Sequence, residues 1–224
     1  MNNHITIAID GPASSGKSSV AKLIAKEQGY IYIDTGAMYR MLTLKALRKE
    51  LDLENEDELF QLLKNTDITF ENQGEEQIAF LDNEDVTTAI RQTDVTNNVS
   101  VVSSHQKIRQ ELVSKQQEMS NDHNVVMDGR DIGTVVLPEA TLKIFLEAEA
   151  EERAKRRYEE NIQNGIDSDY ETILEDIKKR DYYDSNRKES PLKKAHDAQV
   201  IDSTTLSIEE VKDEILKLLQ KNMN

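Results

Sequence analysis

Eight consecutive residues near the N-terminus have the composition of a phosphate-binding loop. Residues 11–18 read Gly-Pro-Ala-Ser-Ser-Gly-Lys-Ser and match the pattern G-x-x-x-x-G-K-[ST] at every position. Glycines let backbone N–H groups turn towards phosphate oxygens, and a following helix adds the positive end of its dipole. We expect Lys17 to reach the β- and γ-phosphates of ATP and the Ser18 hydroxyl to join the shell of a Mg²⁺ ion. The candidate ATP-binding residues are Gly11, Pro12, Ala13, Ser14, Ser15, Gly16, Lys17, Ser18 and Ser19.

Arginines elsewhere in the chain predict a second site for anions. They are Arg40 after Asp34-Thr35-Gly36, Arg130 in Asp128-Gly129-Arg130-Asp131, the helically spaced Arg153, Arg156 and Arg157, and the series Arg180, Asp184, Arg187. Arg130 follows a predicted strand, and ligands of open α/β sheets bind at such strand ends. Asp128 or Asp131 is a candidate to position Mg²⁺ through water. A solvated salt-bridged face explains the helical arginines equally well, and a simple helix cap explains Thr35.

Two anion sites in one chain indicate transfer of a phosphoryl group between them. Such transfer depends on positioning and on neutralising the charge of the moving group. The sequence contains neither the Asn-Lys-x-Asp element of GTPases nor a Leu-Ser-Gly-Gly signature of transport ATPases. The residues by themselves therefore predict a kinase with an anionic acceptor.

Alternating strand and helix patterns must position these residues. The expected order is a strand over residues 5–9, a helix over 18–28, a strand over 30–33 and a helix over 38–49, and strands recur over 125–127, 142–146 and 198–202. This alternation is typical of a parallel sheet with crossover helices, hence an α/β fold. A closing helix over 207–219 begins with Ser207 and Glu210, the residues of a capping box.

The middle of the chain interrupts this rhythm. Residues 67–86 read as strand, turn and strand, with the turn at Asn72-Gln73-Gly74, and residues 95–119 as one long helix or a helix pair. Residues 165–169 have the composition of an exposed loop between two charged helices. We expect a core over 1–34, 95–150 and 196–224, an acceptor-binding insertion over about 35–94, a lid over about 151–170, and an acceptor-contacting helix to about residue 187.

Composition narrows the class of protein. The 224 residues suit one core domain with insertions, and the absence of cysteine excludes disulfides and thiolate metal sites. The net charge of −15 argues against nucleic-acid binding, which needs a basic face. Neither a signal peptide nor an apolar run long enough to cross a membrane is visible, so we expect a cytoplasmic protein.

Several motifs resemble those of the bacterial type of cytidylate kinase along essentially the whole chain. They are residues 10–18, the segment Asp34-Thr35-Gly36-Ala37-Met38-Tyr39-Arg40, the segment 128–136, the segment Ile177-Lys178-Lys179-Arg180-Asp181 with Asp184 and Arg187, and Asp202-Ser203-Thr204. The resemblance implies a three-layer α/β/α P-loop kinase with a small antiparallel β insertion and a helical lid. It also implies Mg-ATP as donor and CMP or dCMP as acceptor, and a monomer.

The family resemblance assigns roles residue by residue. Ser100, Arg109 and Asp131 would recognise the cytosine edge, and Arg180, Asp184 and Arg187 the pentose. Arg40 and Arg130, beside Thr35, would hold the acceptor phosphate. Arg153 and Arg157 would belong to a lid that closes on ATP. The implied catalytic set is Lys17, Arg130, Asp131, Arg153 and Arg157, and the metal set is Ser18 with Asp128 as a candidate.

The sequence departs from the family pattern at two places. Ser18 and Ser19 stand where many relatives have Gly-Thr, which leaves open which hydroxyl approaches Mg²⁺, and Thr35 stands where serine is common. The alternatives are a P-loop kinase for another acceptor, such as UMP, AMP or shikimate, and a nucleotide-binding regulatory ATPase without an acceptor. Turnover with a panel of acceptors distinguishes all three.

Overall fold

A computed structural model describes residues 4–73, 76–163 and 165–223 of the chain. The chain divides into two compact units, which we call the core unit (residues 1–33 and 122–224) and the inserted unit (residues 34–121). The inserted unit contains the helices that the sequence analysis had placed in the core over residues 95–119, because these helices pack with the rest of that unit. The division into core, insertion and lid as functional parts stays a prediction.

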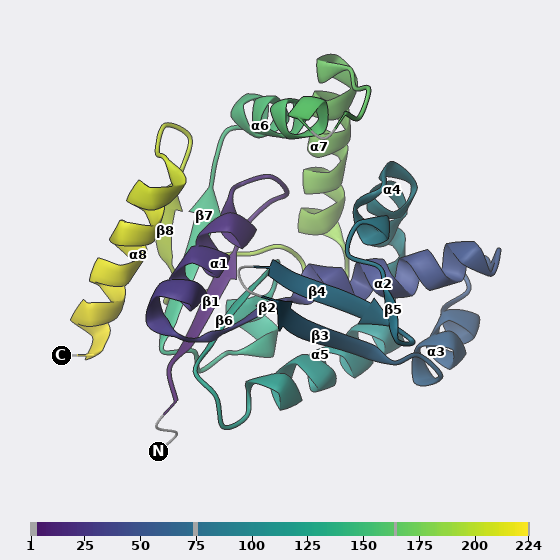
Figure 1. The fold of residues 1–224 in the computed structure, drawn as a ribbon, viewed down its shortest axis with the longest axis horizontal. Helices are drawn as coiled ribbons and strands as arrows, with labels where there is room; N and C mark the ends of the chain where they lie inside the picture. The colour runs from purple at the N-terminus through teal and green to yellow at the C-terminus, as the bar shows by residue number, and fades with distance from the viewer. Residues whose placement is uncertain (1–3, 74–75, 164, 224) are drawn as a thin grey trace. The chain divides into compact units, whose positions relative to one another are not determined.

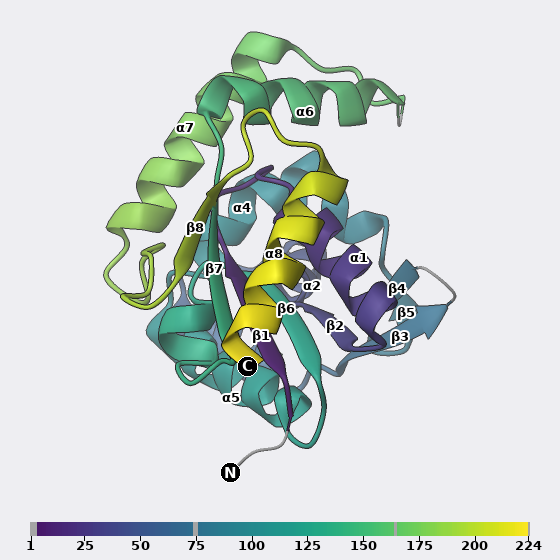
Figure 2. The same cartoon turned by 90° about the vertical axis from the view of Figure 1, so that its left-hand side faces the viewer.

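The core unit is built on a five-stranded sheet in the order β2-β6-β1-β7-β8 (Figures 1 and 2). Its strands are β1 (Thr6–Asp10), β2 (Ile31–Asp34, whose last residue belongs to the inserted unit), β6 (Val125–Gly129), β7 (Leu142–Glu147) and β8 (Gln199–Asp202). β1 pairs in parallel with both β6 and β7, and β7 pairs in parallel with β8. The predicted parallel α/β architecture is thus confirmed. The chain passes from β1 to β2 on one side of β1 and later from β6 to β7 on its other side, so the carboxyl end of β1 lies where the strand order reverses. This is the usual place for a ligand in an open α/β sheet.

Apolar runs explain why these segments become central strands. Ile7, Ala8 and Ile9 are fully buried, as expected for strands that are covered on both faces. Two helices, α1 (Lys17–Gln28) and α8 (Ile208–Met223), lie side by side against this sheet (Figures 1 and 2). They contribute Ile24, Ile215 and others to one hydrophobic cluster with the strands.

Local signals set the C-terminal end of α1 and the N-terminal end of α8 as predicted, whereas α8 ends at Met223 rather than at the predicted residue 219. α1 ends at Gly29, which has a left-handed conformation (φ 68°) and donates its N–H to Ala25. The capping box of α8 is also present: the Ser207 N–H and hydroxyl donate to Glu210 Oε2 at 2.9 and 2.8 Å, and the Glu210 N–H donates back to Ser207 Oγ at 3.3 Å.

The remaining elements of the core unit lie between β6 and β8. A short π-helix (Ile132–Val136), absent from the sequence-based prediction, follows β6. Helices α6 (Ala150–Gln163) and α7 (Tyr170–Asn186) are the two charged helices that were expected around the exposed loop at 165–169 (Figure 1). No helix in the described part of the chain has the length and apolar character needed to span a bilayer.

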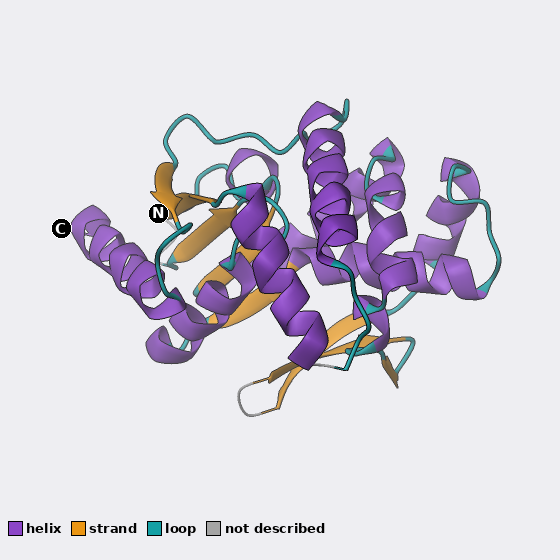
Figure 3. Ribbon diagram, turned by 90° about the horizontal axis from the view of Figure 1, so that it is seen from above, coloured by secondary structure: helices purple, strands orange, loops and turns teal. Residues whose placement is uncertain are grey.

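The inserted unit combines helices with a small antiparallel sheet. Its helices are α2 (Thr35–Arg48), α3 (Glu56–Lys64), a 3₁₀ turn (Ala89–Arg91), α4 (Thr93–Val102) and α5 (Gln106–Ser120), and its strands are β3 (Ile68–Gln73), β4 (Glu76–Leu81) and β5 (Glu84–Asp85). β3 and β4 pair as the predicted antiparallel hairpin (Figure 3). Asn72 and Gln73 belong to β3 rather than to the expected turn, and Gly74 lies outside the described residues.

α2 begins three residues earlier than predicted, and a side chain explains the difference. The Asp34 carboxylate accepts the Ala37 N–H at 2.8 Å and caps the helix. Thr35 is therefore the first helical residue, and its interpretation as the cap is wrong. The expected helix pair over 95–119 is confirmed as α4 and α5.

Candidate active site

The phosphate loop connects β1 to α1 and depends on two glycines. A Cβ on Gly11 would lie 2.3 Å from the Leu146 carbonyl oxygen, and Gly16 has a φ of 90°, a conformation that costs side-chain-bearing residues energy. The Lys17 ammonium donates to the Pro12 carbonyl at 3.1 Å, so it lies across the loop that precedes it. Phosphate binding by this loop stays a prediction.

A carboxylate at the end of β6 lies beside the first turn of α1. Asp128 is almost fully buried; its Oδ2 accepts the Ser18 hydroxyl at 2.7 Å, and its Oδ1 accepts the Tyr32 hydroxyl at 2.8 Å. A hydroxyl and a carboxylate are the hard oxygen donors that Mg²⁺ prefers, and Mg²⁺ at a nucleotide is usually held by one or two such groups together with phosphates. The residues present therefore fit the ion.

Asp10, the last residue of β1, holds the segment that follows Arg130 and Asp131. Its two carboxylate oxygens accept the N–H groups of Ile132 and Gly133 at 2.7 and 2.8 Å. Burial raises the pKa of Asp10 to about 7, although the two N–H donors act to lower it. Asp10 thereby joins the start of the phosphate loop to the loop that carries two of the predicted site residues.

Three predicted arginines surround one buried carboxylate. The Arg130 Nε donates to Asp184 Oδ2 at 3.0 Å, and Arg180 Nε and Arg187 Nη1 each lie 3.9 Å from an Asp184 oxygen. Burial alone would raise the pKa of Asp184, but the charges of Arg130, Arg180 and Arg187 hold it below its usual value. Arg187 stands just after the end of α7 rather than within it, and its Nε donates to the Ser190 carbonyl. The cluster carries an excess of positive charge suited to an anionic ligand.

The arginines of α6 have different surroundings. Arg153 is 4% exposed; it forms a double hydrogen bond with Asp181 and donates to the carbonyls of Ala148 and Ala13. Arg157, one turn later, pairs with Glu160 at 3.5 Å and keeps about a third of its side chain exposed. The two residues that were expected to share a lid function thus differ in environment.

The inserted unit contains the other predicted acceptor residues. Arg40 donates to Asp34 at 2.8 Å; burial would raise the pKa of Asp34, but Arg40, the Ala37 N–H and the charge of Arg91 lower it. Arg109 is buried, lies over the Tyr39 ring and donates to the Ser103 carbonyl at 3.0 Å. Within this unit, Arg40 is therefore held in place by a carboxylate and Arg109 by an aromatic face.

The structure also locates the remaining predicted residues. Thr35 is buried at the start of α2, and Ser100 is half-buried on α4. Asp131 is buried in the core unit and accepts the N–H groups of Val135 and Val136 through its backbone carbonyl. It belongs to a different unit from Ser100 and Arg109, so their joint role in base recognition stays a prediction.

Sequence reasoning assigned no role to three residues that hold this site together: Tyr32, Asp181 and Ser203. Tyr32 reads as an ordinary apolar strand residue, and only its hydroxyl contact with Asp128 distinguishes it. Asp181 and Ser203 lie within quoted motifs, but their partners are distant in sequence. No spacing rule would have found these pairs.

Comparison with known proteins places this geometry in one family. The family model described as cytidylate kinase matches residues 7–221. The chain belongs to the cytidylate kinase family. It is 52% identical over 221 residues to the cytidylate kinase of Bacillus subtilis (strain 168), covering 99% of each chain, and 54% identical to that of Oceanobacillus iheyensis, covering 99% of this chain and 96% of the relative. The family resemblance noted from the motifs is confirmed.

Solved structures with similar folds are much more distant in sequence. An uncharacterised protein from Eubacterium ventriosum superposes with a TM-score of 0.55 at 16% identity, covering 98% of this chain and 99% of its own. A gluconokinase from Sinorhizobium meliloti superposes with a TM-score of 0.51 at 14% identity, covering 99% and 94%. These similarities support the fold alone. Kinase activity follows from the family.

Proposed function

We propose that the protein transfers the γ-phosphoryl group of Mg-ATP to CMP or dCMP, which gives ADP and CDP or dCDP. The observation that carries this proposal is the Asp184 cluster. Arg130 is held on that carboxylate, with Arg180 and Arg187 close by, in the same compact unit as a complete phosphate loop. The phosphate loop accounts for binding of the donor nucleotide, and the arginines of the Asp184 cluster account for binding of an anionic acceptor. Membership of the cytidylate kinase family favours a cytidine nucleotide as that acceptor.

On the donor side, residues 11–19 bind ATP. Their backbone N–H groups and the amino end of α1 meet the phosphates, and Lys17 neutralises charge on the transferred group. Ser18 and Asp128 would hold Mg²⁺ together with the ATP phosphates, and the ion would shield the negative charge of these phosphates. The Ser18 hydroxyl donates a hydrogen bond to Asp128, which leaves the lone pairs of the serine oxygen available to a cation.

On the acceptor side, Arg40, Arg130 and Thr35 hold the CMP phosphate. Buried Asp34 and Asp184 support this role, because they orient two of these guanidinium groups before a substrate binds. Asp184, with Arg180 and Arg187, also contacts the pentose hydroxyls.

Base recognition falls to Ser100, Arg109 and Asp131. An acceptor carboxylate and a donor guanidinium together match the amino group and the ring acceptors of cytosine. Arg153 and Arg157 belong to a lid segment, residues 151–170, that closes over ATP and excludes water, which suppresses hydrolysis. Arg130 and Asp131 complete the catalytic set.

The wider properties of the protein follow from the same proposal. A small-molecule kinase of this composition works as a cytoplasmic monomer with ATP and CMP or dCMP as ligands and without nucleic acid. The functional division is a core over residues 1–34, 95–150 and 196–224, with an acceptor-binding insertion over 35–94.

An acceptor panel tests the proposal. ADP release is measured with Mg-ATP against CMP, dCMP, UMP, AMP, GMP and shikimate, with a control that lacks any acceptor. We expect strong turnover with CMP and dCMP and little with the others. Turnover with a different acceptor would support kinase activity but contradict the assignment of the base-recognition residues. ATP hydrolysis that ignores every acceptor would overturn the proposal.

A further inference from the structure

The motif Asp202-Ser203-Thr204 follows β8 and has no role in the proposed function, yet Ser203 contacts the phosphate loop. The Ser203 hydroxyl lies 3.0 Å from the carbonyl oxygens of both Ser15 and Glu147, and the side chain is almost fully buried. The Ser203 N–H also donates to Glu147 at 2.8 Å. One serine thus joins the end of β7 to the middle of the phosphate loop.

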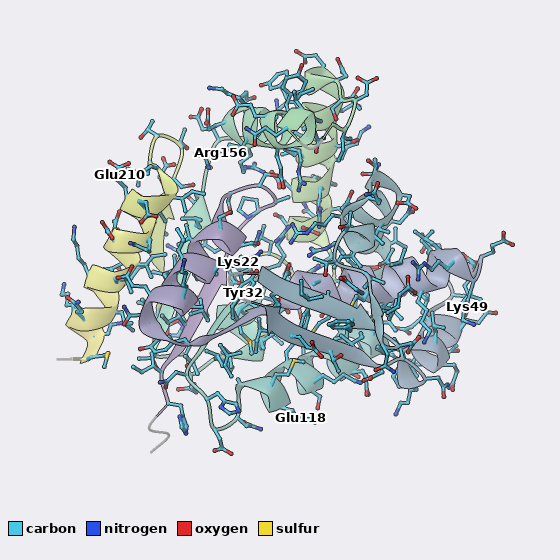
Figure 4. All side chains as sticks on the ribbon, viewed as in Figure 1. Lys22, Tyr32, Lys49, Glu118, Arg156 and Glu210 are labelled. Carbon is cyan, nitrogen blue, oxygen red and sulfur yellow. The ribbon has the colours of Figure 1, made fainter. Side chains whose placement is uncertain are left out.

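Two arginines of α6 extend this contact. Arg156 Nη2 donates to the carbonyl of Ser203 at 2.6 Å and lies 3.3 Å from that of Thr204 (Arg156 is labelled in Figure 4). Arg153 Nη1 donates directly to the carbonyl of Ala13 at 3.1 Å, while Asp181 balances its charge. α6 therefore reaches two carbonyls of the phosphate loop, Ala13 directly and Ser15 through Ser203.

The planarity of the peptide bond gives these contacts a consequence for phosphate binding. In a trans peptide, the C=O of one residue and the N–H of the next point in opposite directions. A donor that fixes the Ser15 carbonyl therefore also fixes the Gly16 N–H, and a donor that fixes the Ala13 carbonyl fixes the Ser14 N–H. Both N–H groups belong to the loop that binds phosphates through its backbone.

Flexible backbone makes such fixing necessary. Gly16 has a φ of 90° and Ser14 a φ of 59°, so both N–H groups belong to residues in the left-handed region. Peptide units beside a glycine rotate easily. A loop whose N–H groups already point inward loses less conformational entropy when a phosphate binds.

We propose that Arg153, Arg156 and Ser203 are positioning residues that preset the phosphate-facing N–H groups of Ser14 and Gly16 from the outer side of the loop. We call this set the α6 brace. This proposal rests on the proposed function, because the phosphates are taken to be those of ATP. It also refines the lid role proposed for Arg153, which acts on ATP through the backbone of the phosphate loop. Arg157, paired with Glu160 at 3.5 Å and partly exposed, is the arginine of α6 that remains for direct contact with ATP.

Binding experiments without phosphoryl transfer test the brace. We would measure by calorimetry the affinities of Ser203→Ala, Arg156→Met and the control Lys155→Met for Mg-ATP, tripolyphosphate and CMP. Lys155 is an exposed cation of the same helix, so its variant removes equal charge without touching the brace. Tripolyphosphate has no adenine and reports on the loop alone.

We expect Ser203→Ala and Arg156→Met to bind ATP and tripolyphosphate about tenfold more weakly, the scale of one lost hydrogen bond. Their affinity for CMP and all affinities of Lys155→Met should stay within about twofold of wild type. If Ser203→Ala does not fold, the partly exposed Arg156 provides the test. Unchanged affinity for tripolyphosphate, or an equal loss for CMP, would overturn the brace. Because these measurements need no acceptor turnover, failure of the wild type to phosphorylate CMP would count against the proposed function and leave the brace standing.

Discussion

The phosphate loop and the Asp184 cluster both prepare charge for an anion, but they are built differently. The loop occupies eight consecutive residues, and its anion-binding groups are mainly backbone N–H groups. The Asp184 cluster brings Arg130 from the end of β6 to Asp184 on α7, 54 residues later, and its groups are side chains. Nearly every property of the first is visible in a short motif, whereas the second exists only when the core unit is folded.

This difference predicts that the two sites respond to different kinds of substitution. A backbone site is sensitive to conformation and to the few residues that hold its carbonyls. A side-chain site is sensitive to its counter-charge, because removing one partner of a buried ion pair leaves the others uncompensated. The following substitutions separate the two cases.

The largest loss is expected for Lys17→Ala. In the proposed function Lys17 supplies the charge that stabilises the transferred phosphoryl group, so we expect kcat to fall by about 10³-fold or more. Circular dichroism should stay native. Lys26→Met, which removes an exposed cation from the same helix, should keep wild-type kcat. Native circular dichroism with retained turnover in Lys17→Ala would show that the loop does not act through this lysine.

Asp184→Asn should mainly affect the acceptor. The amide keeps the shape but removes the counter-charge of three arginines, so we expect KM for CMP to rise by about 100-fold. KM for ATP should change by less than about threefold, since the phosphate loop is built from other residues. Asp176→Asn, an exposed change on the same helix, is the matched control. Equal rises of both KM values would mean that the two sites are not separable.

Tyr32→Phe probes the support of Asp128. Without the Tyr32 hydroxyl, the Asp128 carboxylate, which accepts a hydrogen bond from Ser18, loses its second hydroxyl donor. We expect the Mg²⁺ concentration for half-maximal nucleotide binding to rise by about tenfold, as for other groups that orient a metal ligand.

Tyr30→Phe is the control for this hydroxyl. Tyr30 immediately precedes β2 and packs against the same hydrophobic cluster as Tyr32, so its variant removes a hydroxyl from the same neighbourhood. Both variants keep the aromatic ring at position 32 and its contact with Lys22, whose Nζ lies 5.8 Å from the centre of the Tyr32 ring (Figure 4). Matching Mg²⁺ dependence of the two variants would remove Tyr32 from the metal site.

The smallest effect on activity is expected for Asp10→Asn. The effect of this substitution is measured on the free energy of unfolding. The pKa of Asp10 is about 7 in the folded protein against 3.8 in the unfolded chain, so the folded state binds the extra proton between these values. Stability from this group is therefore complete below about pH 4 and is lost as the pH rises towards 7, on the order of 2 kcal/mol between pH 5 and pH 7.

Urea unfolding at several pH values measures this contribution. The slope of unfolding free energy against pH should be flatter for Asp10→Asn than for the wild type, while Asp176→Asn should retain the wild-type slope. Parallel curves for Asp10→Asn and wild type would show that Asp10 does not titrate in this range.

Strong local signals made much of the fold predictable. The β1 strand, the phosphate loop, α1 with its terminal Gly29 and the capping box of α8 each depend on residues within a few positions of one another. Strand and helix alternation predicted the parallel sheet for the same reason. The start of α2 was placed three residues too late, because the helix begins directly after Asp34, whose carboxylate accepts the Ala37 N–H, and the apolar spacing of the helix does not show this contact.

The sequence by itself predicted a phosphate-binding loop at residues 11–18 and indicated membership of the cytidylate kinase family, because both depend on short contiguous motifs. Only the tertiary structure decided which partners hold the charged side chains. It assigned Arg130 to Asp184, Ser18 to Asp128, and Arg153 to Asp181 and the Ala13 carbonyl. Hydrogen bonds and buried ion pairs depend on distance in space, and chain spacing does not encode that distance for residues on separate strands and helices.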